Sequence, residues 1–381
     1  MANSALNPPI LMLDLHAQHA PIHAELEAAL HHCLKESSFI QGPAVGAFAQ
    51  ALSQHLGISH VVPCANGTDA LQLALMSLRL PPGSEVLVPA FTYVATLEAA
   101  AILGLVPVVV DVLPNTFMLD PKAVEAALTP RTGAIIAVHL FGQCADLESL
   151  RRIADKNNIA LIEDNAQSIG ATFTTRSGET WVAGAVGEVG TTSFFPSKNL
   201  GAMGDGGALF TQDASRAELL RQLANHGQIR KYQHEYIGLN SRLDTMQAAL
   251  LQVKLRYLNQ WTSARQHVAA QYDAAFTGMA GVHTPARDPR STHVFHQYTL
   301  RVTEAGCRAA LQQHLLAKGV PSVVYYPLPV HLQPAYHYLG YRTGQFPVAE
   351  HLCQTVLSLP IHPTLVPEQV AYITDAVKCF F

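Results

Sequence analysis

Charge is scarce in this chain, and its 28 acidic residues slightly outnumber its 24 lysines and arginines. Only 14% of the 381 residues are charged, and the formal net charge is −4. A nucleic-acid-binding protein needs a basic face. The basic pairs here, Arg151-Arg152 and Arg230-Lys231, are short and isolated. The composition therefore argues against nucleic acid as a partner.

Long apolar runs and paired cysteines are also missing. Runs such as LVPVVVDVL and GAIIAVHLF fall short of the ~18 residues that a membrane span needs. The opening MANSALNPPILMLDL has no basic segment followed by an apolar one, so we expect no secretory signal. The six cysteines are scattered without a C-x-x-C pair. We therefore expect reduced thiols in a cytoplasmic protein without a membrane segment.

Two nucleotide-binding loops and a metal motif are absent as well. Neither G-x-G-x-x-G nor G-x-x-x-x-G-K-[ST] occurs, which disfavours NAD and ATP as cofactors. The histidine-rich spots at 31–33 and 293–296 match no established metal-ligand spacing. We expect no metal site.

What the chain does have is a regular alternation of apolar strands and helices. The expected strands are 85–91, 106–112, 133–141 and 159–164, and the expected helices between them are 95–104, 121–129 and 146–158. Continuous apolar strands alternating with helices are typical of a mostly parallel sheet covered on both faces. The fold class is therefore α/β.

The length favours two domains. Residues 242–273 have the pattern of one long helix, and after it come a loop, an alternating strand in HQYTLRV and another helix. We place the boundary near residue 257, which gives a large domain of residues 1–257 and a smaller C-terminal α/β domain of residues 258–381.

Two candidate sites follow strands of the parallel sheet, whose carboxyl ends gather ligands. In CANGTDAL, Gly67 and Thr68 begin a helix, which indicates either a phosphate site or an ordinary capped turn. In IALIEDNAQSIGA, Glu163 and Asp164 end an apolar strand. A buried carboxylate needs a cation or donors, but Asp164 could equally cap a helix over NAQSIG.

A third candidate is Lys198 in SFFPSKNLGAMGDGGALF, a single cation among small residues, with Ser193 and Ser197 nearby. It is either a solvated loop lysine or a lysine that bonds to a cofactor aldehyde. A fourth stretch, HGQIRKYQHEYIGLNSRLDTMQAA, has the polar composition of a functional loop. Together, an anion site, a carboxylate and a lysine are what pyridoxal phosphate requires.

Several of these motifs resemble one family. PAFTYVATLEAA, HLFGQCADLESL, EDNAQSIGA, SFFPSKNLGAMGDGGALF, NHGQIRKYQH, GLNSRLDTMQAALLQVKL and YYPLPVHLQPAY are very similar to the DegT/StrS nucleotide-sugar aminotransferases, over about residues 10–365. Within that family the motifs most resemble the aminotransferases that act on UDP-2-acetamido-2-deoxy-3-keto-glucuronate in bacterial O-antigen and lipopolysaccharide synthesis. The resemblance implies a fold-type-I, aspartate-aminotransferase-like homodimer with shared active sites.

The resemblance also implies roles by position. The catalytic pair would be Lys198, which bonds to pyridoxal phosphate, and Asp164, which holds the ring nitrogen. The other cofactor contacts would be Gly67, Thr68, Tyr93, Gln167, Ser193 and Asn240 of the partner subunit. The substrate contacts would be Arg242, Tyr326 and His331. The family pattern further suggests that the loop around Lys198 is loose, so that the lysine can swing free.

Glutamate would be the amino donor and the keto sugar the acceptor. Three alternatives stay open: amination of a 3-keto or 4-keto dTDP-, UDP- or GDP-hexose, a same-fold sugar dehydratase, and a non-catalytic regulatory protein. A dehydratase would carry histidine in place of Lys198, and a regulatory protein would be expected to lose Lys198 or Asp164. Members often have a histidine where this chain has Tyr325, so the sugar specificity is open too.

Overall fold

The computed structural model of the protein describes residues 9–303 and 306–381. The expectation about a secretory signal rests partly on residues 1–8, which lie outside the described residues. Within the described ranges, no helix has the length and apolar character needed to cross a membrane.

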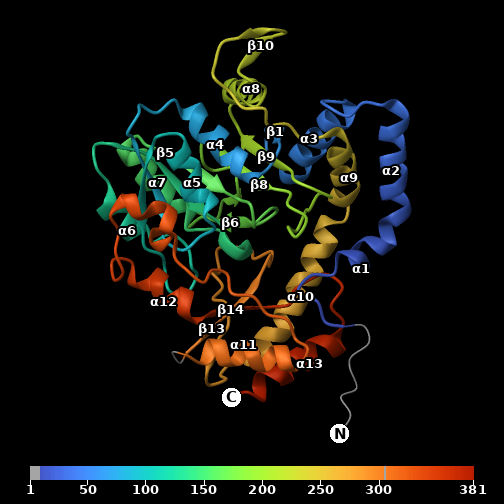
Figure 1. Ribbon diagram of the computed structural model, residues 1–381, viewed down its shortest axis with the longest axis vertical. Helices are drawn as coiled ribbons and strands as arrows, with labels where there is room; N and C mark the ends of the chain where they lie inside the picture. Colours follow the sequence, from blue (N-terminus) through green and yellow to red (C-terminus); the bar gives the residue numbers. More distant parts are fainter. Residues whose placement is uncertain (1–8, 304–305) are drawn as a thin grey trace.

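A seven-stranded sheet forms the centre of the larger part of the molecule (Figure 1). Its strand order is β1-β9-β8-β5-β4-β2-β3. The strands are β1 (His60–Cys64), β2 (Glu85–Pro89), β3 (Val106–Val110), β4 (Thr132–Val138), β5 (Ala160–Asp164), β8 (Val189–Ser193) and β9 (Gly207–Thr211). Only β9 runs antiparallel to its neighbours. The expected mostly parallel sheet is confirmed.

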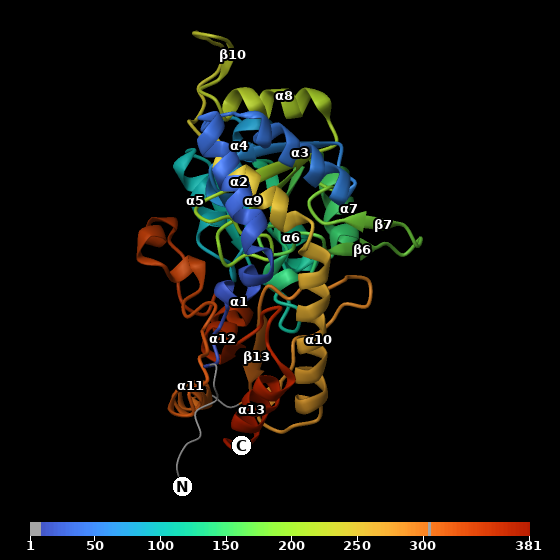
Figure 2. The same cartoon turned by 90° about the vertical axis from the view of Figure 1, so that its right-hand side faces the viewer.

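Helices flank this sheet (Figure 2). Those that pack on its strands are α3 (Pro43–Leu56), α4 (Gly67–Leu78), α5 (Ala95–Ile102), α6 (Pro121–Ala127), α7 (Leu147–Asn157) and α8 (Ala214–Leu223), whereas α1 (Leu15–His19) and α2 (His23–Glu36) precede them along the chain and α2 packs against α9 (Thr245–Leu255). Local sequence sets the ends of α3: Pro43 supplies a helical φ at its first position, and Gly57 ends it with a φ of 68°. Short 3-10 turns lie at Ala20–Ile22, Leu140–Gly142, Val330–Leu332 and Pro334–Leu339.

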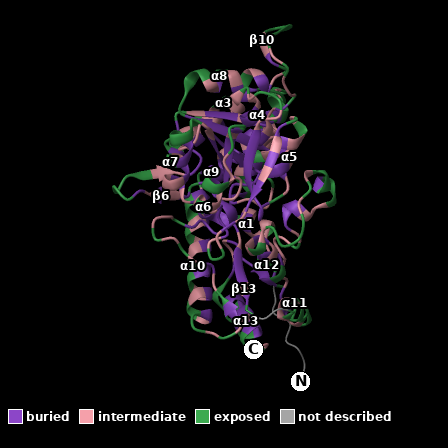
Figure 3. Cartoon of the chain, turned by 90° about the vertical axis from the view of Figure 1, so that its left-hand side faces the viewer, coloured by how far each residue is buried: buried purple, intermediate pink, exposed green. Residues whose placement is uncertain are grey.

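The strands β2, β4 and β5 carry consecutive apolar side chains because both faces of the sheet are covered. Side chains such as Val88, Ile135 and Ile162 are fully buried. Figure 3 shows buried residues concentrated in the central strands and in β13. Hydrophobic burial on both faces explains why period-two alternation is missing from these segments.

The single long helix expected over residues 242–273 is wrong. The structure has two helices, α9 (Thr245–Leu255) and α10 (Leu258–Phe276), separated by a turn in which Tyr257 N donates to Lys254 O at 3.0 Å. The apolar periodicity continues across this turn, so the pattern does not reveal it. Because α9 begins only after Asp244, Arg242 does not lie at a helix start.

The C-terminal part has its own antiparallel sheet and core (Figure 1). Its elements are β12 (Val282–His283), β13 (Tyr298–Val302), β14 (Val356–Leu359), α11 (Cys307–Ala317), α12 (Pro347–Thr355) and α13 (Pro367–Lys378). Ile10, from near the N-terminus, packs into the same core. The boundary at residue 257 falls in the turn between α9 and α10 and stays a prediction.

Two small hairpins extend from the larger part. One is formed by β6 (Thr172–Thr174) and β7 (Thr180–Val182), and the other by β10 (Gln228–Arg230) and β11 (Gln233–His234). The second projects from the end of the molecule farthest from the C-terminus (Figure 1). It carries the exposed part of the polar stretch that the sequence marks as a functional loop.

Candidate active site

A pocket of about 480 Å³ lies where the parallel strands of the large sheet end. Segments after β1, β2, β4, β5 and β8 form most of its wall, and residues 296–297 and 325–326 form the remainder. It is lined by eight of the residues predicted from the sequence: Gly67, Thr68, Tyr93, Asp164, Gln167, Ser193, Lys198 and Tyr326. Asn240, Arg242 and His331 are not among its lining residues.

One end of the pocket is built for an anion. Gly67 begins α4, where the first backbone N–H groups have no partner within the helix. A Cβ on Gly67 would lie 2.8 Å from Cβ of Ser193, so only glycine permits this close approach. The Ser193 hydroxyl accepts a hydrogen bond from Phe195 N, which leaves its proton free to donate. The helix dipole and these hydroxyl and N–H donors favour a phosphate at this end.

Asp164, the last residue of β5, lines the pocket. Its side chain accepts hydrogen bonds from Ala166 N at 3.2 Å and from the Thr96 hydroxyl at 3.1 Å. Burial raises the pKa of the Asp164 carboxyl, and these hydrogen bonds and the charge of Lys198 only partly offset that effect. No helix follows β5 over residues 165–171, so the interpretation of Asp164 as a helix cap is wrong.

The neighbouring carboxylate, Glu163, points away from the pocket into the protein. It accepts hydrogen bonds from the backbone of Gly184, Val186 and Gly187 at 2.7–2.8 Å and contacts His139 Nε2 at 2.9 Å. Burial alone would raise the pKa of Glu163, but these donors outweigh it and lower the pKa. Of the two carboxylates that end β5, only Asp164 is available to a ligand.

Lys198 lies in a turn just beyond β8, and its side chain lines the pocket. Burial lowers the pKa of the ammonium group to about 8, although the negative charge of Asp164 acts in the opposite direction. A lysine with this pKa has a useful fraction of neutral amine near neutral pH. This position does not fit a solvated loop lysine.

The loose loop expected around Lys198 is not what the structure has. Backbone hydrogen bonds join Phe194 to Gly206 and Ala202 to Phe194, each at 2.7 Å. Lys254, buried in α9, donates to Gly201 O at 2.8 Å. A Cβ on Gly201 would lie 2.3 Å from Pro196 O. Gly201 therefore serves compact packing in a loop that backbone hydrogen bonds hold together.

Gln167 and two tyrosines form the side of the pocket. Gln167 Oε1 accepts from Phe141 N at 2.7 Å, and its Nε2 donates to the Tyr326 hydroxyl at 3.2 Å. The rings of Tyr326 and Tyr93 have centroids 6.2 Å apart. Tyr93 is 57% exposed, so one ring face is available for stacking on a flat ligand.

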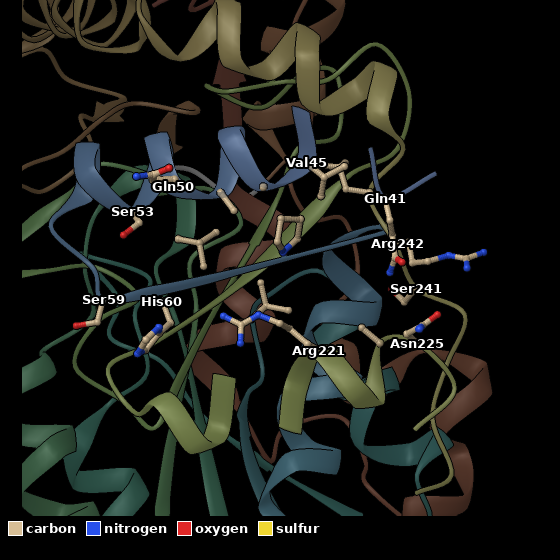
Figure 4. A pocket seen from close by; sticks show the side chains of 17 residues that line it. Gln41, Val45, Gln50, Ser53, Ser59, His60, Arg221, Asn225, Ser241 and Arg242 are labelled. Carbon is tan, nitrogen blue, oxygen red and sulfur yellow. The ribbon is translucent and has the colours of Figure 1, made fainter. Parts of the chain in front are cut away.

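The three remaining predicted residues lie elsewhere. Asn240 is exposed and pairs with Asn225 in an isolated bridge. Arg242 lines a second pocket of about 480 Å³ between α3, β1 and α8, where Figure 4 shows it beside Gln41 and Ser241. His331 is fully buried, with Nε2 3.2 Å from Glu350. His331 is therefore not among the residues that line the active-site pocket, and its contact with substrate stays a prediction.

Sequence reasoning missed several residues of the pocket wall. Thr92, His296 and Gln297 line the pocket, and Thr96 lies beside it with its hydroxyl on Asp164. His296 and Gln297 directly precede β13, and nothing in HQYTLRV distinguishes them from the start of an ordinary strand. Their role becomes visible only when the C-terminal part is placed against the carboxyl ends of the large sheet.

Comparison with known proteins gives close matches over nearly the whole chain. Residues 21–378 match the DegT/DnrJ/EryC1/StrS aminotransferase family. UDP-2-acetamido-2-deoxy-3-oxo-D-glucuronate aminotransferase of Pseudomonas aeruginosa is 43% identical, over 97% of this chain and 99% of the relative. UDP-N-acetyl-3-dehydro-alpha-D-glucosamine 3-aminotransferase of Acidithiobacillus ferrooxidans is 42% identical, over 98% of each chain.

The structural likeness is equally close. The crystal structure of DesV of S. venezuelae, in complex with a ketimine intermediate, superposes with a TM-score of 0.93 at 40% identity, covering 98% of each chain. The expected fold class is confirmed by this match.

Proposed function

The chain belongs to the DegT/DnrJ/EryC1/StrS aminotransferase family, and from this we propose that it aminates a 3-keto nucleotide sugar. The first candidate substrate is UDP-2-acetamido-2-deoxy-3-keto-glucuronate, with glutamate as the amino donor. The observation that carries the proposal is that Lys198, Asp164 and the anion site around Gly67 and Ser193 meet in one pocket.

The residues present fit pyridoxal phosphate, the cofactor of this family. Gly67, Thr68 and Ser193 would hold its phosphate, Asp164 its ring nitrogen and Lys198 its aldehyde carbon. Gln167 would contact its 3′ oxygen, and Tyr93 would stack on its ring. When bound, the cofactor supplies a conjugated ring that accepts the electron pair of a breaking Cα–H bond.

The chain's own groups then have separate tasks. Asp164, a buried carboxylate with few donors, favours a protonated nitrogen beside it because that cation relieves the cost of its burial. Lys198 Nζ would hold the aldehyde carbon of the cofactor and, as a neutral amine beside it, would take a proton from the donor's Cα and return it. A pKa of about 8 suits both tasks.

The choice of sugar rests on different evidence. One relative carries the name of a uronate enzyme and another that of a neutral-sugar enzyme, at 43% and 42% identity, so identity alone does not choose between them. We assign the uronate carboxylate to Arg242, which forms no ion pair with any described residue of its own chain. Because Arg242 lies outside the pocket of its own chain, this role requires a partner subunit.

A homodimer with shared active sites is supported by exposed apolar side chains near the pocket. Phe39, Ile40, Phe195 and Met203 are 43–52% exposed, and Phe195 lines the pocket itself. Phe39 O accepts a hydrogen bond from Thr245 N. The side-chain amide of Gln247 hydrogen-bonds to both the N–H and the carbonyl of Met203. These contacts place Phe39 and Met203 near the start of α9. Such a surface favours a protein partner. In this dimer, Asn240 of the partner subunit would reach the cofactor phosphate.

The setting of the reaction follows from the proposed substrate. Amination of a UDP-hexuronate would serve the assembly of a bacterial surface polysaccharide such as O-antigen, in the cytoplasm where nucleotide sugars are made. Amination of a neutral 3-keto UDP-hexosamine is the second candidate, favoured by the near-equal match to the neutral-sugar relative.

A panel of half-reactions tests the substrate. The enzyme is first treated with glutamate to load its cofactor with the amino group, and the excess is removed. It is then mixed separately with the 3-keto UDP-hexuronate, the neutral 3-keto UDP-hexosamine and 4-keto dTDP- and GDP-hexoses. We expect the original cofactor absorbance to return fastest with the uronate. Faster return with a 4-keto sugar would contradict the proposal.

A further inference from the structure

Two polar side chains at the edge of the C-terminal part, His296 and Gln297, reach the active-site pocket and form few hydrogen bonds to the rest of the protein. His296 and Gln297 line the same pocket as Lys198. His296 is only 7% exposed, yet its Nδ1 has no hydrogen-bond partner in the described part of the chain. Its Nε2 has only a weak contact, 3.5 Å, with Gln297 Nε2. The hydrogen-bonding capacity of this pair is therefore left for a ligand.

The backbone that carries these side chains is held firmly in place. Gln297 N donates to Phe141 O at 3.2 Å, and Val294 N donates to Gly142 O at 2.8 Å. A Cβ on Gly142 would lie 2.7 Å from Phe295 N, so the two segments touch as closely as glycine allows. A segment tied this tightly to the large sheet presents its side chains in one fixed position, as a binding site requires.

The same wall continues to Gln167 and Tyr326. Phe141 joins them, because its carbonyl accepts from Gln297 N and its own N–H donates to Gln167 Oε1. The Tyr326 hydroxyl accepts from Gln167, so its proton remains free to donate. Burial raises the pKa of Tyr326 and keeps that proton in place. The wall therefore carries imidazole, amide and phenol donors next to one another.

The charge behind this wall is positive and uncompensated. The guanidinium of Arg265 is buried and donates only to backbone carbonyls, those of Phe295, His296 and Ile361. It forms no ion pair with a described carboxylate, and burial lowers its pKa only to about 10, so it stays charged at neutral pH. An anion in front of His296 would relieve this charge.

Within the pocket itself, cations are few. Lys198 is the only lysine or arginine among the lining residues that the structure describes. Burial, together with the charges of Lys198 and Arg265, lowers the pKa of His296 well below its usual range, so the imidazole is a neutral donor. Neutral donors in front of a buried positive charge can bind a carboxylate reversibly, which suits a reactant that must leave after each cycle.

We propose that His296 and Gln297, together with the Tyr326 hydroxyl, bind a carboxylate group of a reactant, in the first place that of the amino donor. The inference rests on the proposed function, because an amino-acid donor brings carboxylates into a pocket that has no free arginine of its own chain. A hexuronate sugar is the second possible source of the same group.

Equilibrium binding gives a test that is independent of turnover. Cofactor-loaded protein is titrated with glutarate, a dicarboxylate without an amino group, and with glutaramide, its neutral analogue, by calorimetry. We expect His296→Phe and Gln297→Leu each to weaken glutarate binding at least tenfold while glutaramide binding changes little. His283→Phe, at an exposed position of β12, is the matched control and should bind as the wild type does. His296→Gln, which keeps an N–H donor, should recover part of the affinity.

Loss of fold is checked separately. Each variant is examined by thermal unfolding and by borohydride trapping of the cofactor on Lys198, followed by mass spectrometry. Normal trapping together with weak glutarate binding supports the proposal. Wild-type glutarate affinity in both His296→Phe and Gln297→Leu would overturn it.

Single-turnover reactions identify the source of the carboxylate. If the amino donor is bound here, the variants need at least tenfold more glutamate for half-maximal rate, and both 3-keto sugars react as with wild type. If the uronate is bound here, only the 3-keto UDP-hexuronate reaction weakens, and the neutral sugar is unaffected. A wild-type enzyme that glutamate cannot aminate would refute the donor assignment in the proposed function, while the glutarate titration would still test this subsite.

Discussion

Two neighbouring carboxylates at the end of β5 should respond to substitution in opposite ways. Glu163 accepts hydrogen bonds from three backbone N–H groups and contacts His139 inside the protein, whereas Asp164 accepts two and faces the pocket. The donors lower the pKa of Glu163, and burial raises the pKa of Asp164. Glu163 therefore stabilises the fold when ionised, whereas ionisation of Asp164 costs stability in the cofactor-free protein.

The magnitude for Glu163→Gln follows from its contacts. Ala145 N donates to His139 Nδ1, so Nε2 carries the proton that Glu163 accepts. The amide of glutamine can accept on one side only. In one orientation its NH₂ group would face both Gly184 N and His139 Nε2, and in the other both Val186 N and Gly187 N. At about 1–3 kcal/mol for each buried donor left unpaired, plus the lost charge, we expect a loss of roughly 3–5 kcal/mol.

Asp164→Asn should leave stability unchanged or slightly raised at neutral pH, because a carboxyl with a raised pKa loses its stabilising contribution as the pH rises through that pKa. In this variant the rate at which glutamate aminates the bound cofactor should fall on the order of 10²-fold or more, because an amide cannot stabilise the positive charge on the cofactor's ring nitrogen.

Chemical denaturation of the cofactor-free proteins measures the predicted changes in stability, and single-turnover absorbance measures the predicted loss of rate in Asp164→Asn. The wild-type protein should also lose stability as the pH falls through the lowered pKa of Glu163, and Glu163→Gln should lose this acid dependence. The reasoning would be refuted by a loss under 1 kcal/mol for Glu163→Gln, or by near-normal rates for Asp164→Asn.

Three further predictions concern Lys198 and the proposed dimer. The rate at which cofactor-free enzyme takes up pyridoxal phosphate should rise with pH around a midpoint of about 8, because the neutral amine is the nucleophile; a midpoint near the ordinary lysine value of about 10.4 would contradict the burial of Lys198. Mixing inactive Lys198→Ala and Asn240→Ala chains should restore activity through one intact site per mixed dimer, and no recovery despite verified subunit exchange would argue against shared sites. Arg242→Lys should cost ~1.5–3 kcal/mol in kcat/KM on the 3-keto UDP-hexuronate and far less on the neutral sugar, because it removes the planar guanidinium that can donate to both oxygens of a carboxylate. Equal losses on both sugars would make Arg242 structural.

The sequence predicted the large sheet well because its signals are local. Apolar strands such as 160–164 alternate with helices, and polar residues stand at the strand ends. The carboxyl-end rule for parallel sheets then brings Gly67, Asp164 and Ser193 together without knowledge of any distance. Lys198 stands out by its setting among small residues, Gln167 is assigned by resemblance, and both line the same pocket.

The errors come from features that only tertiary contacts decide. The turn at residues 256–257 interrupts an apolar period that continues unbroken in the sequence, and it is held partly by the contact of the Tyr257 hydroxyl with Glu25 in α2. The glycines after Lys198 suggest mobility, yet a Cβ on Gly201 or Gly207 would lie only 2.3 Å or 2.5 Å from backbone atoms of Pro196 or Asn66. His331 lies in a motif that resembles a substrate loop, but its hydrogen-bond contact with Glu350 and its burial could not be read from that motif.

The central claim is that Lys198 is the residue that bonds to the cofactor, and borohydride reduction followed by peptide mass spectrometry tests it most directly. Protein loaded with pyridoxal phosphate is reduced, digested and mapped, with Lys198→Ala as the parallel sample. We predict a single cofactor adduct on the peptide that contains Lys198, and none in Lys198→Ala, which should remain folded and hold the cofactor noncovalently. An adduct on another lysine, or no adduct in wild-type protein that carries one cofactor per chain, would contradict this account of the site.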